Sequence, residues 1–200
     1  MNIKYIVLCS KGNSAREANV ELMKLEIPEL RVINCTLDNV FPAHIAALNV
    51  ADEYDGVLML EDDVQLCRNF KQRVDALIAS HLREVVSMFE GACSKNEMHS
   101  EYRNGREFAW NQCNYWPREV GKILSDPKWM IPFIEWFDKR NEPWGYPIDV
   151  YQAYVLGKCK IKYWMEVPFL VQHLDMRSNF KGRSTKRQTK YFADDLEQIQ

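Results

Sequence analysis

The sequence predicts a single α/β domain, and three observations support this fold class. Strand and helix signals alternate along the chain, which is typical of proteins that pack helices against a central sheet. Residues 56–60 form a continuous apolar run, as expected of a central strand covered on both faces. The chain has 200 residues, 46% of them hydrophobic and 27% charged, which suits one globular domain with a core and leaves no room for a second catalytic domain.

The first half is expected to alternate between strands and helices. Ser14 and Glu17 have the spacing of a capping box, so a helix should begin at Ser14 and end near Leu25, before Pro28. Pro42 suits the first turn of the next helix. Strands are expected at residues 5–9, 31–37, 56–60 and 84–89, and helices at residues 14–25, 42–54 and 69–82.

The second half is rich in tryptophan and proline. Its residues 91–105 are polar and aperiodic, which predicts a mobile loop. Gly157 suits the C-terminal cap of a helix. Helices are expected at residues 117–124, 128–140 and 147–156, and strand-like structure at residues 160–170, leading to residues 171–173.

Composition excludes several classes of protein. No apolar run approaches the roughly 18 to 20 residues that span a bilayer, and the N-terminus has no cleavage site of an export signal. We therefore expect no membrane span and a cytoplasmic location, which is the host cytoplasm if the chain is encoded by a phage. The six cysteines include no CxxC pair, so buried reduced thiols are expected rather than a zinc site.

Three consecutive acids, Glu61, Asp62 and Asp63, follow the central apolar strand directly. Ligands of open α/β sheets bind beyond the carboxyl ends of the strands, so these side chains should face a binding crevice. In an extended backbone Glu61 and Asp63 would point to one side and Asp62 to the other. Crowded carboxylates repel one another unless a cation lies among them, and such oxygen ligands suit Mg²⁺ or Mn²⁺. The alternative is a loop of solvated acids.

The stretch LMLEDDVQLCRNF resembles the DxD-type motif of GT-A glycosyltransferases, in particular small bacterial and viral transferases with an EDD motif and an aromatic residue near Phe70. The resemblance implies a GT-A type, Rossmann-like domain with a mixed, mostly parallel sheet flanked by helices. It also implies a nucleotide-sugar-binding half (1–92), an acceptor-side half (93–176), and a basic donor-closing segment with the C-terminal tail (177–200).

The resemblance also implies roles for individual residues. The divalent metal would be held by Glu61, Asp63 and His173. The nucleotide-sugar donor would be held by Ser10, Lys11, Arg16, Asp38, Asp62, Ser178, Asn179 and Lys181. The first acid of the motif is glutamate here rather than aspartate, so either Glu61 or Asp62 shares the coordination with Asp63. The chain is short for such a domain, which implies a minimal acceptor half or an oligomer.

Asp149 lies in the first turn of a predicted helix, near aromatic residues. The resemblance implies that it is the general base that takes the proton from the acceptor hydroxyl. The alternative is an acid that complements the helix dipole. Trp129, Phe133 and Trp136 have the helical spacing of core residues. The candidates for an aromatic platform, on which sugars or bases stack, are Trp110, Trp116, Trp144 and Tyr146.

The acceptor is either a glycan or a hydroxymethylated base in DNA. Residues 177–190 carry six basic residues and no acid, which favours an anionic ligand and leans towards DNA. We expect the donor to be a uridine diphosphate sugar. Two other classes of function remain: a metal-dependent nucleotidyl or phosphoryl transferase, although the chain has no GxxxxGK[ST] loop, and a non-catalytic module that binds nucleic acid.

Overall fold

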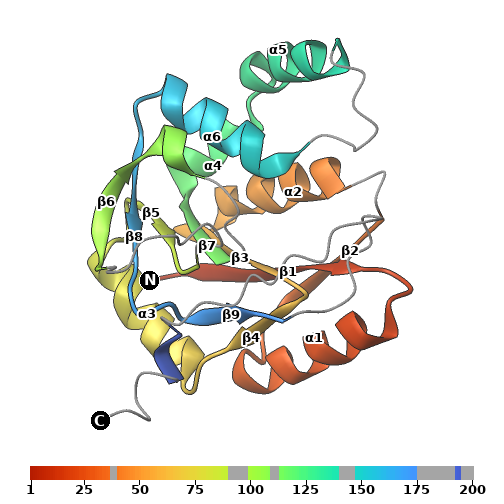
Figure 1. The fold of residues 1–200 in the computed structure, drawn as a ribbon, viewed down its shortest axis with the longest axis vertical. Helices are drawn as coiled ribbons and strands as arrows, with labels where there is room; N and C mark the ends of the chain where they lie inside the picture. Colours follow the sequence, from red (N-terminus) through yellow and green to blue (C-terminus); the bar gives the residue numbers. More distant parts are fainter. Residues whose placement is uncertain (37–39, 90–98, 109–112, 140–146, 175–191, 195–200) are drawn as a thin grey trace.

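The computed structural model describes residues 1–36, 40–89, 99–108, 113–139, 147–174 and 192–194. Its centre is a seven-stranded sheet in the order β2-β1-β3-β7-β5-β8-β6 (Figure 1). The strands are β1 (Ile3–Ser10), β2 (Arg31–Cys35), β3 (Gly56–Glu61), β5 (Val85–Ser87), β6 (Glu101–Asn104), β7 (Cys113–Pro117) and β8 (Lys162–Met165).

Strand β1 is parallel to β2 and β3, and β5 is parallel to β8. Strand β7 is antiparallel to β3 and β5, and β6 is antiparallel to β8. Five of these strands therefore point the same way, which confirms the expected Rossmann-like α/β fold.

Helices cover both faces of this sheet (Figure 1). One face, the α1 face, is covered by α1 (Ser14–Glu26) and α3 (Phe70–Ser80). The other, the α2 face, is covered by α2 (Val40–Asn49), α4 (Arg118–Ser125), α5 (Pro127–Asp138) and α6 (Ile148–Lys158). Alternation along β1 supplies both cores, because Tyr5 and Val7 face the α1 side while Ile6 and Leu8 face the α2 side. Short 3₁₀ helices, η2 (Val50–Glu53) and η3 (Gly105–Glu107), complete the α2 face.

A second, two-stranded sheet lies on the α1 face. It pairs β4 (Val64–Leu66) with β9 (Val171–His173) in antiparallel register. Val64, Leu170 and Val171 are buried in the core beneath it. Because β4 follows directly from β3, this small sheet lies just beyond the carboxyl end of a central strand.

Three local predictions were wrong. Asn13, not Ser14, caps α1, with its side chain accepting a hydrogen bond from the Arg16 amide, while Glu17 bonds the amide of Gly12. Gly157 lies inside α6, whose cap is Cys159. The predicted loop 91–105 contains β6, which pairs with β8 at the edge of the sheet; residues 91–98 of that loop lie outside the described part of the chain.

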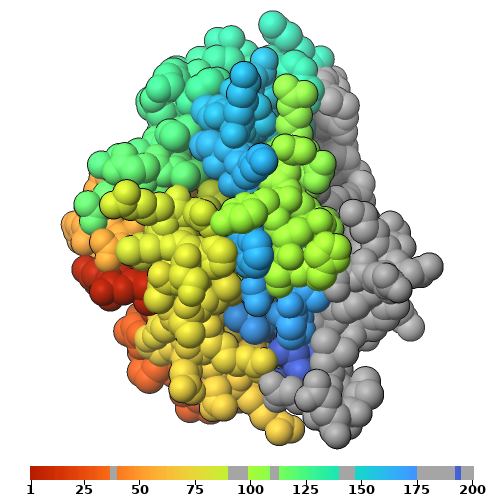
Figure 2. All heavy atoms as spheres, turned by 90° about the vertical axis from the view of Figure 1, so that its left-hand side faces the viewer, coloured from red at the N-terminus to blue at the C-terminus, as the bar shows by residue number. Residues whose placement is uncertain are grey.

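Strand β7 was not predicted either. It forms because its residues pair with β3 on one side and β5 on the other, which buries the whole strand. Figure 2 shows the edge of the sheet that β6 forms, where β6 lies beside α3. There the hydroxyl of Tyr102 on β6 donates to Glu84, which follows α3, at 2.8 Å.

Within the described residues, no helix is long and apolar enough to cross a membrane. The five described cysteines are free thiols. Four of them are buried, namely Cys9, Cys35, Cys67 and Cys113, and Cys159 is partly buried.

Candidate functional site

The small β4–β9 sheet brings His173 beside Asp63, although the two residues are far apart in the sequence. Val64 is paired with His173 in the register of the two strands. The amide of Leu174 donates to the carbonyl oxygen of Asp63 at 2.7 Å, which extends the pairing by one residue. As a result the Nε2 atom of His173 lies 3.4 Å from Oδ2 of Asp63, and both side chains are buried. The predicted proximity of these two residues is therefore present in the structure.

The three acids do not alternate as an extended backbone would require. Strand β3 ends at Glu61, and Asp62 and Asp63 form a turn before β4. Asp62 and Asp63 consequently converge on one guanidinium, that of Arg16 on α1. The Nη2 atom of Arg16 lies 2.7 Å from Oδ2 of Asp63, and the Nη1 atom bonds Oδ1 of Asp62. The prediction that Glu61 and Asp63 project together fails because the strand stops one residue too early.

Glu61 continues the face of β3 that carries Val57 and Met59, and these two residues belong to the core of the α2 face. Its side chain is half-buried. Glu61 therefore lies on the other side of the sheet from Arg16, whose helix covers the α1 face.

Asp62 is bonded within the protein through both carboxylate oxygens. Arg16 binds Oδ1, and the backbone amide of Ser10 donates to Oδ2 at 2.6 Å. Asn19 also stabilises this turn, because its Nδ2 atom donates to the carbonyl oxygens of Asp62 and Val64, each at 2.9 Å. These bonds fix the ends of β1 and β3 to α1. The structure thus gives Ser10 and Asp62 positions that hold the turn in shape.

The charges of this cluster stabilise one another. Burial alone would lower the pKa of Arg16, but the neighbouring charges of Asp63 and Asp62 outweigh it, so the pKa of the guanidinium is raised. Burial, together with the charge of Asp62, also raises the pKa of Cys9 and of Cys35 to about 11. Both thiols are therefore protonated at neutral pH, which makes them poor nucleophiles.

Asp63 and His173 fit a divalent cation as neighbouring ligands. Metal–oxygen and metal–nitrogen bonds of roughly 2.1 Å place adjacent ligand atoms roughly 3.0 to 3.5 Å apart, and the measured separation is 3.4 Å. Asp62 and Asp63 carry two negative charges against the single positive charge of Arg16, so the cluster keeps an excess of negative charge. Among the described residues no three His, Cys, Asp or Glu side chains gather in a metal-binding arrangement. A cation here would take its remaining ligands from water or phosphate, as Mg²⁺ sites commonly do.

Other predicted site residues lie elsewhere or outside the described chain. Lys11 is exposed in the turn after β1, directly beside Ser10. Asp149 is half-buried in the first turn of α6, on the α2 face. No interaction that the structure describes joins Asp149 to Asp63. The residues outside the described ranges are Asp38, Ser178, Asn179 and Lys181 and, among the aromatic candidates, Trp110, Trp144 and Tyr146.

The aromatic assignments need two corrections. Trp116, expected in a platform, is completely buried in β7, where its ring packs against Phe108 with centroids 5.2 Å apart. Trp136, expected in the core, is 46% exposed because only Phe133 of α5 is fully buried. Trp129 is half-buried against the core of the α2 face, as expected.

Asn19 is the residue of this site that the sequence analysis missed. The buried side of α1 consists of Arg16, Asn19, Val20 and Met23. Two polar residues on the buried stripe of a helix require polar partners, since an unpaired buried polar group is costly. That pattern indicates a buried polar contact for α1, and the three acids after β3 were candidate partners at a strand end.

Comparisons with family models and with curated proteins find no match. Among solved structures, the crystal structure of A197 from STIV is similar to this chain, with a TM-score of 0.51. The two share 13% sequence identity over 82% of this chain and 81% of that chain. At this identity the similarity concerns the fold alone.

Proposed function

We propose that this chain is a metal-dependent glycosyltransferase of the GT-A type, which transfers a sugar from a nucleotide diphosphate sugar to an acceptor hydroxyl. The observation that carries the proposal is the buried group of Asp63, His173 and Arg16 beyond the carboxyl end of β3. Ligands of Rossmann-like sheets bind at that edge. The Rossmann-like fold, which A197 shares, and the resemblance of LMLEDDVQLCRNF to the EDD motif agree with this proposal.

Each residue of the cluster would have a defined task. Arg16 orients Asp63 through its bond to Oδ2, while the Asp63 carboxylate and Nε2 of His173 offer ligand atoms to a divalent cation. When bound, Mn²⁺ or Mg²⁺ would stabilise the charge on the departing nucleoside diphosphate. Lys11 follows the anchored Ser10 and is exposed, so its ammonium group is available to a phosphate.

Asp149 is the proposed general base, on the strength of the family resemblance. Its half-buried position at the start of α6 leaves the carboxylate accessible to an acceptor. Under this hypothesis Asp149→Asn would lower the rate of transfer by about 100-fold or more and leave the affinity for manganese and uridine diphosphate unchanged. Unchanged transfer would remove Asp149 from the mechanism and leave the proposed metal site intact.

The test of the function is donor hydrolysis. The protein is incubated with Mn²⁺ and a panel of nucleotide sugars, and release of nucleoside diphosphate is measured. Slow hydrolysis of uridine diphosphate sugars that stops with a chelator is the expected result. Release of pyrophosphate from a nucleoside triphosphate would instead favour a nucleotidyl transferase. If neither reaction occurs and calorimetry shows no joint binding of Mn²⁺ and uridine diphosphate, the proposal is wrong.

The choice between glycan and DNA acceptors needs a separate measurement. Binding to hydroxymethylated duplex DNA is measured at several salt concentrations. A steep loss of affinity with added salt is expected if several phosphates are contacted. A flat response would exclude DNA and leave the glycan.

A further inference from the structure

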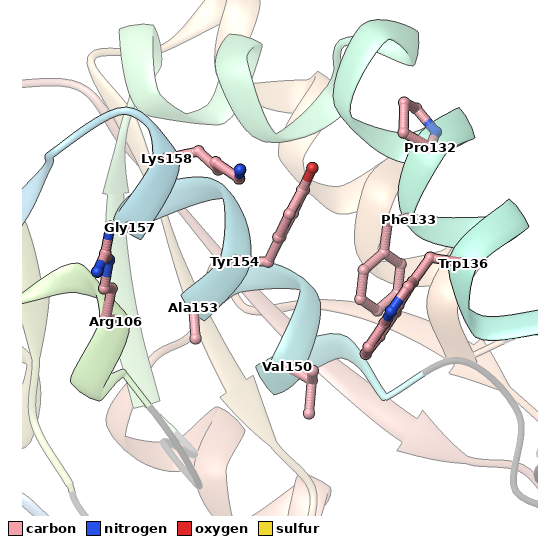
Figure 3. A pocket seen from close by; sticks show the side chains of 9 residues that line it. All are labelled: Arg106, Pro132, Phe133, Trp136, Val150, Ala153, Tyr154, Gly157 and Lys158. Carbon is pink, nitrogen blue, oxygen red and sulfur yellow. The ribbon is translucent and has the colours of Figure 1, made fainter. Parts of the chain in front are cut away.

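The layer of α5 and α6 contains a groove that the proposed transfer reaction does not use. Its volume is about 600 Å³, within the usual range for sites of small ligands. Figure 3 shows the nine side chains that line it: Arg106, Pro132, Phe133, Trp136, Val150, Ala153, Tyr154, Gly157 and Lys158. None of these residues belongs to the acidic cluster, and α5 and α6 cover the opposite face of the sheet from β4 and β9 (Figure 1).

One end of the groove is apolar. Trp136 packs against Phe133 with ring centroids 5.8 Å apart, and Val150 lies across from them on α6. Two of the apolar side chains that line this end are exposed, Trp136 by 46% and Val150 by 42%. Apolar surface gathered around a concave site is a common mark of ligand binding.

The other end is cationic. Lys158 and Arg106 lie at the left of Figure 3, with Tyr154 between them and the aromatic end. The ammonium group of Lys158 lies 5.7 Å from the centre of the Tyr154 ring. Gly157 lets Arg106 lie flat against α6, because a Cβ atom at that position would come within 2.4 Å of Cγ of Arg106. None of the described residues that line the groove is acidic, so the two cations would attract an anionic group.

Charged residues of both signs lie near the groove in the sequence. Glu107, Glu135 and Asp138 are exposed, and so are Lys128 of α5 and Lys139 at its end. A single phosphate or carboxylate needs only the two cations that line the groove. The described lining contains no Asp, Asn, Glu or Gln side chain that would bond several sugar hydroxyls.

From this distribution we infer that the groove binds a single-chain amphiphile with one anionic group, such as a fatty acid or an alkyl phosphate. The hydrocarbon chain lies against Trp136, Phe133 and Val150, and the phosphate or carboxylate lies between Arg106 and Lys158. This inference does not depend on the proposed transferase activity, because it concerns a different face of the molecule.

The test uses dodecyl phosphate below its critical micelle concentration, with binding measured by calorimetry on the full chain. Lys158→Gln is expected to weaken binding about five- to tenfold, because a charge-assisted bond is lost. Trp136→Ala is expected to weaken it by a similar factor through loss of apolar contact. Lys122→Gln on α4 and Leu25→Ala on α1 are matched controls, since both residues are exposed and lie outside the groove, and they should bind as the unaltered protein does.

Three outcomes would overturn the inference. If dodecyl maltoside bound as tightly as dodecyl phosphate, Arg106 and Lys158 would not distinguish an anionic headgroup from an uncharged one. Unchanged affinity in Lys158→Gln would place the anion elsewhere, and because this lysine is exposed the variant is expected to fold. Binding only to vesicles of anionic lipid, with none to monomeric dodecyl phosphate, would indicate a membrane-surface contact instead of a groove. A circular dichroism spectrum of each variant checks that the fold is retained.

Discussion

The two faces of the sheet bury polar groups in different ways. On the α1 face, Asp62 and Asp63 are buried with a guanidinium that binds both, and Asn19 closes the turn that carries them. On the α2 face the core is almost wholly apolar, and the buried histidine described on that face is His44 of α2. Charges that remain ionised in a protein interior need a partner of opposite sign, whereas a lone imidazole can stay buried by remaining neutral. The comparison shows that paired charges are buried on the α1 face, which is where we propose that the divalent cation binds.

The largest expected effect comes from removing the charge that compensates the acids. Arg16→Ala leaves Asp62 and Asp63 buried together without a counter-charge, and should lower the free energy of unfolding by about 3 to 5 kcal/mol. Urea unfolding at pH 7 measures this loss. Arg16→Lys should recover only part of it, because an ammonium group does not present two parallel N–H donors. Arg31→Ala, an exposed arginine on β2, is the matched control and should cost under about 0.5 kcal/mol. A small effect of Arg16→Ala would mean that the pair of acids is protonated or solvated.

The next effect concerns catalysis on the α1 face. Asp63→Asn keeps the size of the side chain but removes a charged ligand atom, so metal-dependent donor hydrolysis should fall by about 100-fold or more. Thermal unfolding should change little, since Arg16 still binds Asp62. Stabilisation by added Mn²⁺ and uridine diphosphate, seen as a higher melting temperature for the unaltered protein, should disappear.

Asp52→Asn is the control for this variant, because Asp52 is an exposed acid on η2 whose partner is Lys122. It should hydrolyse the donor at the unaltered rate. If Asp63→Asn retains both hydrolysis and ligand-induced stabilisation, the acidic cluster is structural and the metal site lies elsewhere.

How far the sequence predicted these two faces depends on how local each signal is. Strands β1 and β3 were predicted because each is a short apolar run, and helices α1 and α3 because the signals for each also lie within a single segment. Strand β6, with sequence EYRN, has no apolar alternation and is specified by its pairing with β8. Strand β7 is likewise specified by its two neighbours.

The site shows the same division. The sequence placed Asp63 and His173 together correctly through the family resemblance. It assigned Arg16 to the donor, whereas the structure pairs Arg16 with Asp62 and Asp63. This pairing depends on the turn at Asp62 and Asp63, and no local sequence pattern predicted that β3 would end at Glu61.

A smaller effect should appear on the α2 face as a dependence of stability on pH. Burial lowers the pKa of His44 from 6.5 to about 4, because the charged imidazolium is disfavoured in an apolar core. The unfolded chain therefore takes up a proton before the folded protein does. The stability that neutral His44 provides is present above pH 6.5 and is lost as the pH falls towards 4, with a total of about 3 kcal/mol. His44→Leu should flatten this part of the unfolding free energy curve.

His99→Gln is the control, since the side chain of His99 is 78% exposed and should contribute no such dependence. Unfolding in urea between pH 7 and pH 4 compares the three proteins. Equal slopes for the unaltered protein and His44→Leu would mean that other groups account for all acid sensitivity.

The smallest expected effect is that of Trp136→Ala, and its comparison with Phe133→Ala separates the groove from the core beneath it. Phe133 and Trp136 are neighbours on α5, yet Phe133 is 2% exposed and Trp136 is 46% exposed. Phe133→Ala leaves a cavity among Phe41 and Tyr151, whose rings lie 6.2 and 5.1 Å from its own, and should cost about 3 to 5 kcal/mol. Trp136→Ala removes a larger ring but less buried contact, and should cost under about 1 kcal/mol. Trp136 would then contribute little to stability, and its exposed ring would give the α2 face an apolar surface that can contact a ligand. If instead Trp136→Ala destabilised the protein as much as Phe133→Ala, the tryptophan would belong to the core and the groove would lose its apolar wall.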